Sequence, residues 1–365
     1  MEGEKRPGHP PVVRLKVEPE PRRRKALPPK KPVFAFSTVT FYACRFDDRR
    51  EASLVMPETE RHRGRYRFSV AACCSTILLV VAGALVTNDY AGDSVPDWPL
   101  AYGRLVPPMI GGIRFEYTHR VIAGIVSILT LVLAIWLART ESRPTARRLG
   151  WTALGLVIAQ ALLGGIRVLV GYPALSATMH AIMAELFLMT LVGLSLYISP
   201  WWQRDLPLLD DSSSPRLPAL AASMTAAVLV QTVAGAAFRH GAIGIAPHLI
   251  GACLVAVLVL WTGRAAKKRF GQVAEIRRGV ILLHATLGTQ ILLGLAAWWA
   301  MSQASEAGGQ PSVVYLALTV GHVLGGALTL AASVILTLSS YRLIRAADPR
   351  AVQPRAEGSA ERAGV

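Results

Sequence analysis

The sequence predicts an all-α integral membrane protein in which eight transmembrane helices form two tandem four-helix bundles. Of its 365 residues, 52% are hydrophobic and only 17% are charged, whereas soluble domains carry about 25% charged residues. Eight apolar segments reach the ~20 residues that a helix needs to cross a bilayer. The formal net charge is +16, but the basic residues lie between apolar runs. This pattern excludes a soluble α/β enzyme and a nucleic-acid-binding domain.

The eight segments are separated by Pro, Gly and charged residues, as at Arg143-Pro144 and Gly308–Pro311. Because lipid offers no hydrogen-bond partner to bare backbone, we expect each segment to be helical. The predicted spans are residues 68–87, 115–138, 149–169, 175–199, 217–238, 242–263, 279–301 and 312–340.

Lys and Arg are distributed unequally between the two sets of connecting loops. Eighteen lie in or beside one set, in clusters such as Arg61–Arg67 and Arg264–Arg278, and five lie at the other. Because positively charged loops stay in the cytoplasm, both termini are predicted to be cytoplasmic. The predicted location is the cell (inner, cytoplasmic) membrane.

The chain divides into five predicted regions. The first is basic and rich in Pro, lacks helical periodicity and is expected to be a disordered cytoplasmic tail; Met56 is an alternative start. We find no apolar run and cleavage site typical of a signal peptide in it. The regions are the tail 1–66, a bundle 67–200, a cytoplasmic linker 201–216, a second bundle 217–343 and a disordered tail 344–365.

The two halves of the sequence resemble each other. Val81–Leu85 in span 1 matches Val233–Ala237 in span 5, and Gln160–Gly164 in span 3 matches Gln290–Gly294 in span 7. Such a repeat predicts two bundles of the same topology, related by an axis along the membrane normal.

Four of the eight histidines lie on the even-numbered spans, one on each, near the non-cytoplasmic end. A single intramembrane His often serves only to join helices by a hydrogen bond. Four at matching positions favour two pairs of imidazoles, each able to hold a haem iron from both faces. A zinc site is disfavoured, since the four cysteines form no CxxC pair and zinc prefers three or four close ligands. The predicted ligands are His119, His180, His248 and His322.

Two other histidines leave alternatives open. His240 lies eight residues before His248 and would replace it if span 6 began earlier. His284 has no counterpart in span 3 and is expected to be a core histidine.

Glu116 distinguishes the first half, because it precedes His119 by three residues and therefore shares its helix face. An ionisable carboxyl group at the membrane edge is costly and usually functional. The alternative is an interfacial anchor paired with Arg120 or Arg114. The first half also has the longer external loop, residues 88–113.

These residues resemble the haem A synthase family, most specifically over residues 83–125. The segment Val95-Pro-Asp-Trp-Pro-Leu100 is similar to the family's first external loop, and Glu116-Tyr-Thr-His-Arg120 to its Glu-x-x-His-Arg motif. The resemblance runs from about residue 66 to residue 343 and leaves the N-terminal tail uncovered. One departure is the absence of the external cysteine pair of many bacterial members, since Ser94, Val95 and Ala101 occupy that stretch.

The resemblance implies oxidation of a ring methyl group of haem O to a formyl group, through a hydroxymethyl intermediate. It assigns His119 and His180 to the substrate haem, His248 and His322 to a permanent haem b, and catalysis to Glu116. It also implies haem O synthase as a candidate partner; a homo-oligomer, the electron donor and the source of oxygen are left open.

Several residues near the non-cytoplasmic side have two interpretations. Arg120, Arg167 and Arg239 are candidates for binding haem propionates or are snorkelling side chains. Trp98 either covers a haem or anchors the interface, and Asp97 is expected to cap a turn. The rival function is a dihaem cytochrome b that only transfers electrons, which would leave Glu116 without a role; a transporter or haem exporter is a third.

Overall fold

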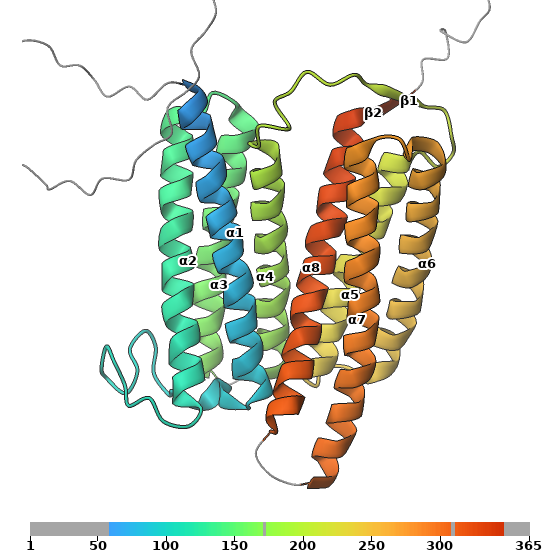
Figure 1. Cartoon of the computed structure of the whole chain (residues 1–365). Helices are drawn as coiled ribbons and strands as arrows, with labels where there is room; N and C mark the ends of the chain where they lie inside the picture. Colours follow the sequence, from blue (N-terminus) through green and yellow to red (C-terminus); the bar gives the residue numbers. More distant parts are fainter. Residues whose placement is uncertain (1–57, 171–172, 308–310, 347–365) are drawn as a thin grey trace, which may run out of the picture. The chain divides into compact units, whose positions relative to one another are not determined.

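The computed structural model describes residues 58–170, 173–307 and 311–346. Within these residues the chain forms eight long α-helices (Figure 1). All eight are long and apolar enough to cross a membrane, which confirms an all-α, multi-pass membrane protein. The helices are α1 (Glu58–Asn88), α2 (Ile113–Thr140), α3 (Pro144–Val170), α4 (Pro173–Tyr197), α5 (Leu217–Arg239), α6 (Ile245–Phe270), α7 (Ala274–Ala307) and α8 (Val313–Leu343).

The structure confirms eight membrane-spanning helices, and most of them extend beyond the predicted spans at one end or both. Some predicted residues lie outside the helices, namely 198–199, 242–244 and 312. Helix α1 begins at Glu58, ten residues before the predicted span, and therefore enters the region predicted to be a tail. Apolarity marks where a helix crosses lipid and not where its hydrogen bonding ends, so a basic helical turn is invisible to a hydropathy criterion. The remaining predictions for both tails concern residues 1–57 and 347–365, outside the described residues.

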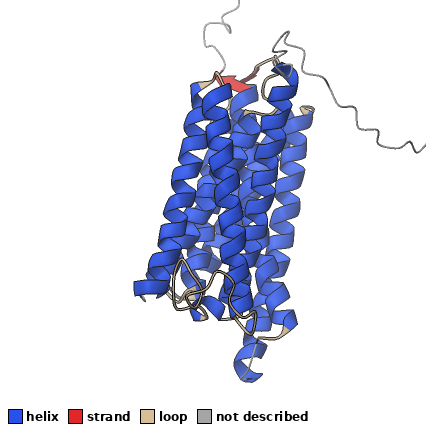
Figure 2. Cartoon of the chain, turned by 90° about the vertical axis from the view of Figure 1, so that its left-hand side faces the viewer, coloured by secondary structure: helices blue, strands red, loops and turns tan. Residues whose placement is uncertain are grey.

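Consecutive helices run in opposite directions (Figure 1), and the turned view shows that all the helices lie roughly along one common direction (Figure 2). We name the end where α1 begins the basic end, and the opposite end, which carries residues 89–112 and the short helix η1 (Ala91–Asp93), the loop end. Helices α1–α4 enclose one apolar core and α5–α8 a second. A third apolar cluster joins α1, α4 and α8.

Two short strands at the basic end differ from the predicted linker and tail. Strand β1 (Leu209–Asp211) pairs in parallel with β2 (Ile344–Ala346). The Asp211 carboxylate accepts the Leu217 N–H at 2.8 Å and so caps α5. The linker is thus pinned to the end of α8.

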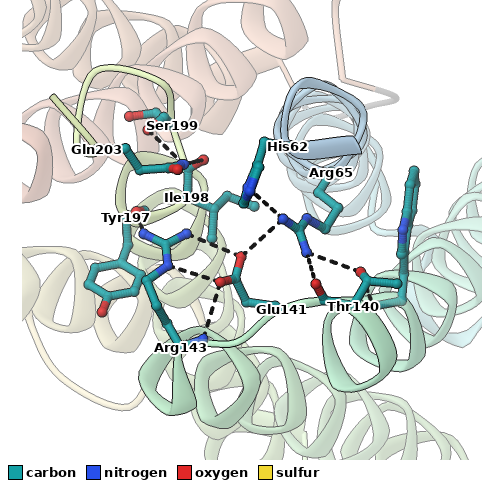
Figure 3. A network of polar contacts seen from close by, with 10 residues as sticks. His62, Arg65, Thr140, Glu141, Arg143, Tyr197, Ile198, Ser199 and Gln203 are labelled. Atoms are coloured by element: carbon teal, nitrogen blue, oxygen red, sulfur yellow. Dashed lines mark hydrogen bonds and ion pairs between the residues drawn. The ribbon is translucent and has the colours of Figure 1, made fainter. Parts of the chain in front are cut away.

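A buried ion cluster closes the basic end of the first bundle (Figure 3). Arg65 of α1 lies 3.5 Å from Glu141, and Arg143 lies 2.9 Å from the other oxygen of the same carboxylate. Arg143 also donates to the Tyr197 carbonyl at 3.1 Å, so one acid ties α1, α3 and the end of α4 together. Burial would raise the pKa of Glu141, but hydrogen bonds and charge from Arg143 outweigh it and hold the pKa low.

Candidate functional site

The four even-helix histidines meet in two pairs. His119 of α2 faces His180 of α4, with ring centroids 6.5 Å apart and an interplanar angle of 67°. His248 of α6 faces His322 of α8, with centroids 6.1 Å apart and an angle of 86°. All four lie within the first three turns of their helices from the loop end. The structure therefore brings together the residues that the sequence pairs, at matching depth in the two bundles.

A glycine on the preceding helix faces each of these rings. A Cβ built on Gly83 of α1 would lie 3.1 Å from Cε1 of His119, and one on Gly164 of α3 would lie 3.4 Å from Cε1 of His180. In the second bundle, a Cβ on Gly235 or Gly294 would lie 2.9 Å from the facing histidine. Each imidazole therefore occupies space that a larger residue would fill.

The residue four positions before each glycine faces the same ring. His322 Nδ1 lies 3.2 Å from the Gln290 carbonyl, and Gln231 Nε2 lies 3.0 Å from His248 Nδ1. His119 and His180 lie near the backbone of Leu79 and Gln160, and by geometric criteria Nδ1 of each ring has no hydrogen-bond partner among the described residues.

Glu116 holds the external loop against α2. The residue is 4% exposed, and its Oε2 accepts the Val95 N–H at 2.9 Å. Arg120 donates to Oε1 at 2.6 Å and to the carbonyls of Asp97 (2.7 Å) and Leu100 (3.0 Å). The ion pair of the anchor interpretation is therefore present, and Arg120 is engaged by the loop.

The loop also packs against α3 beside the first histidine pair. The Trp98 ring packs on Gly165 of α3, where an added Cβ would lie 2.8 Å from Cδ2, and Gly165 adjoins the Gly164 that faces His180. Asp97 caps the turn as predicted, because its carboxylate accepts the N–H groups of Tyr102 (2.6 Å) and Gly103 (2.8 Å). The Gly103 bond is the main cause that lowers the pKa of Asp97.

Cationic side chains from both bundles gather at the loop end. Arg167 donates to the Gly92 carbonyl at 2.9 Å. Arg239 makes neither a hydrogen bond nor an ion pair with any described residue, although it lies near His240, His322 and the Tyr315 phenol. Burial, followed by the charges of Arg239 and Arg167, lowers the pKa of His240 to about 4. His240 stays neutral at pH 7.

The structure resolves both ambiguous histidines. His240 follows the last residue of α5 and lies outside α6, so His248 is the partner of His322. His284 lies 2.7 Å from the Val280 carbonyl of its own helix and packs against Gly263, as expected for a core histidine. Within the described residues no group of three or more His, Cys, Asp or Glu could hold a metal ion.

Two buried polar residues escaped the sequence reasoning. Both side-chain polar atoms of Asn88, which is 1% exposed, are without a partner among the described residues, and so is Oε2 of Glu185. Glu185 could have been found, because it is the one acid in the middle of an apolar span. The four glycines lie at matching positions of the sequence repeat. Each is the last residue of a five-residue segment: Leu79–Gly83, Gln160–Gly164, Gln231–Gly235 and Gln290–Gly294.

Comparison with known proteins supports the family resemblance. A region of 123 residues is 34% identical to the haem A synthase of Shouchella clausii, covering 33% of this chain and 40% of that protein. The haem A synthase of Lysinibacillus sphaericus is 36% identical over 116 residues, 31% of this chain and 38% of that protein. The haem A synthase of Symbiobacterium thermophilum is 29% identical over 263 residues, 62% of this chain and 83% of that protein.

The matched region spans about two fifths of the length of the first two relatives. No protein-family model matches the chain.

Proposed function

We propose that this chain, a member of the haem A synthase family, oxidises a ring methyl group of haem O to a formyl group through a hydroxymethyl intermediate. In this proposal the first bundle binds haem O through His119 and His180, and the second holds haem b through His248 and His322. The observation that carries it is the occurrence of two facing histidine pairs, each ring set against a glycine.

The spacing of the rings fits a metal ion held between them. His119 and His180, with ring centroids 6.5 Å apart, would hold one haem iron, and His248 and His322, with centroids 6.1 Å apart, would hold the other. His322 can donate from Nδ1 to the Gln290 carbonyl, which leaves Nε2 in the unprotonated form that binds metal.

Unpartnered groups around the pairs also fit a large ligand with carboxylates. Buried polar groups without partners are rare in native proteins, and side-chain atoms of His119, His180 and Asn88 lack them among the described residues. Arg239, which is partly exposed, also makes no hydrogen bond or ion pair with a described residue. Arg239 and Arg167 have the chemistry and position to bind propionates. Arg120 is a weaker candidate, since Glu116 and the loop carbonyls occupy its guanidinium.

When bound, haem iron supplies the oxidising power that side chains lack. The chain's contribution is orientation and charge. Glu116 would stabilise positive charge or accept a proton at the reacting methyl group, while Trp98 and the loop would exclude water from the first pair.

The architecture is part of the proposal. The same helix neighbours pack in both halves, α1 with α2 and α3 with α4 as α5 with α6 and α7 with α8, which supports a tandem repeat. The loop charges support cytoplasmic termini in a cell membrane. Haem O synthase is the proposed partner and lipid the surroundings.

Expression in a host that makes haem O tests the proposal. The purified protein should yield haem b together with haem O or its oxidised products, identified by chromatography and mass spectrometry. Glu116→Gln should keep both haem sites but yield no haem A, while Asp205→Asn, an exposed acid at the basic end, should behave as the wild type. Normal haem A from Glu116→Gln would refute the catalytic role.

The ion pair between Glu116 and Arg120 favours one rival, a dihaem cytochrome b that only transfers electrons. In that case Glu116 is a loop anchor. Haem b at two per chain, with no haem A when haem O is supplied, would establish this function.

A further inference from the structure

We propose that Glu185 is a proton-exchanging carboxyl group inside the membrane region, at the junction of α1, α4 and α8. It takes up a proton when a neighbouring haem is reduced and releases it on reoxidation. The inference rests on the proposed binding of haem but not on haem A synthesis, so an electron-transfer function would leave it intact.

Helix geometry places Glu185 between the two bundles. It precedes Leu188 by three residues and Val192 by seven, so the three share one face of α4. Leu188 and Val192 belong to the apolar cluster that also contains Ala327 and Val334 of α8 and Ile77 of α1. Glu185 lies five residues, about 7.5 Å along the helix, from His180, towards the middle of the membrane.

The carboxyl group has nothing to pair with there. Its Oε2 is shielded and has no hydrogen-bond partner among the described residues. The helices packed against α4 are α1, α3, α5 and α8, and no hydrogen bond or ion pair joins Glu185 to a described residue of these helices. The titratable and charged groups on those helices are Glu58, Glu60, Arg61, His62, Arg63, Arg65, Tyr66, Arg67, Cys73, Cys74, Arg147, Arg148, Arg167, Arg239, Tyr315, His322, Tyr341 and Arg342.

Stability does not explain such a residue. A buried polar group without a partner costs about 1–3 kcal/mol, and ionised acids inside membranes usually mark proton pathways. Ala327 stands five residues after His322, as Glu185 stands five after His180, and the first bundle alone carries the acid. The reaction proposed for that bundle moves protons as well as electrons.

A change of charge at the haem couples to the protonation of Glu185, because the proton compensates the added charge. A one-electron donor, such as dithionite in solution, reduces the haem iron and adds one electron to the region. Uptake of one proton from water by the Glu185 carboxylate restores the charge, and transfer of the electron to a one-electron acceptor, such as ferricyanide, releases that proton. In the low-dielectric interior this compensation is strong because screening is weak.

Infrared difference spectroscopy on the full chain in lipid nanodiscs tests the inference. The wild type should show a carboxylic acid C=O band that shifts in D2O and changes on reduction of the bound haem. The band should vanish in Glu185→Gln, persist at a shifted position in Glu185→Asp, and remain in Thr190→Val, a control on the same helix. Haem content should be equal in all four proteins.

Three results would overturn the inference: a band that survives Glu185→Gln, a band that is silent to both D2O and reduction, or loss of haem in Glu185→Gln and Glu185→Asp alike, which marks a structural role. If the chain binds no haem, the proposed function fails first and the redox coupling fails with it. Absence of haem A with an intact redox-sensitive band would refute only the synthase reaction.

Discussion

Substitution of the four facing glycines by alanine should weaken haem binding in the order of their contact distances. The built Cβ lies 2.9 Å from the histidine at Gly235 and Gly294, 3.1 Å at Gly83 and 3.4 Å at Gly164. Ordinary van der Waals contact begins at about 3.4 Å, so the rings at Gly235 and Gly294 must move by about 0.5 Å.

Overpacking of this kind costs about 1–3 kcal/mol. If the imidazole bears that cost, the affinity of the protein for haem falls by about 5-fold to 150-fold. Gly164→Ala should leave binding nearly unchanged, and Gly83→Ala should be intermediate. The alanine otherwise favours the helix by ~1 kcal/mol, so a loss of haem cannot come from helix propensity.

Haem retained after purification and the visible spectrum of the bis-histidine form measure the effect. Gly288→Ala on α7 and Gly155→Ala on α3 are matched controls, because nothing lies within 4 Å of a Cβ at either position. Equal haem content in Gly235→Ala and Gly288→Ala would refute the argument that the glycines make room for the ligands.

Three further outcomes are expected. Glu141→Gln should lower thermal stability. The contribution of Glu141 to the stability of the wild type should be full above the pKa of the unfolded state and should be lost as pH drops through the lowered pKa of the folded state. Thermal melts at a series of acidic pH values check both. Asp97→Ala should loosen the external loop, seen as faster hydrogen exchange at Tyr102 and Gly103, and the lowered pKa of Asp97 means that acid should do the same to the wild type. Arg239→Leu should reduce retained haem b and change its reduction potential, while Arg104→Gln, an exposed residue of the same end, should do neither.

Periodic apolarity and the repeat predicted the helices and the histidine pairs because both depend on local sequence. The composition of a segment indicates that it spans the membrane, and histidines that recur at matching positions of a repeat indicate which of them pair. The ends of the helices were not predicted in this way. Helix α1 begins at Glu58, but the basic turns that extend it carry no apolar signal.

Contacts between residues far apart in the sequence were harder to predict. Asp97 as a turn cap could be predicted, since its acceptors lie within six residues. The cluster that joins Arg65 to Glu141 could not, because the partners are far apart in the sequence and each resembles an ordinary positively charged or interfacial residue. Strand β2 was missed for the same reason, since its partner lies 135 residues away.

The two bundles arrange their histidine pairs in the same way but differ in the residues around those pairs. Both pairs have a glycine opposite each ring, so either could hold a haem by the same geometry. Within the described residues, the first bundle carries a loop held by Glu116 and Trp98, and an acid, Glu185, five residues after its ligand. Under the proposed function, a cofactor that stays bound would need a fixed pair of ligands and little else. A substrate that enters, reacts and leaves would need a cover that opens and groups that exchange protons, and the loop and Glu185 are the candidates for these two roles.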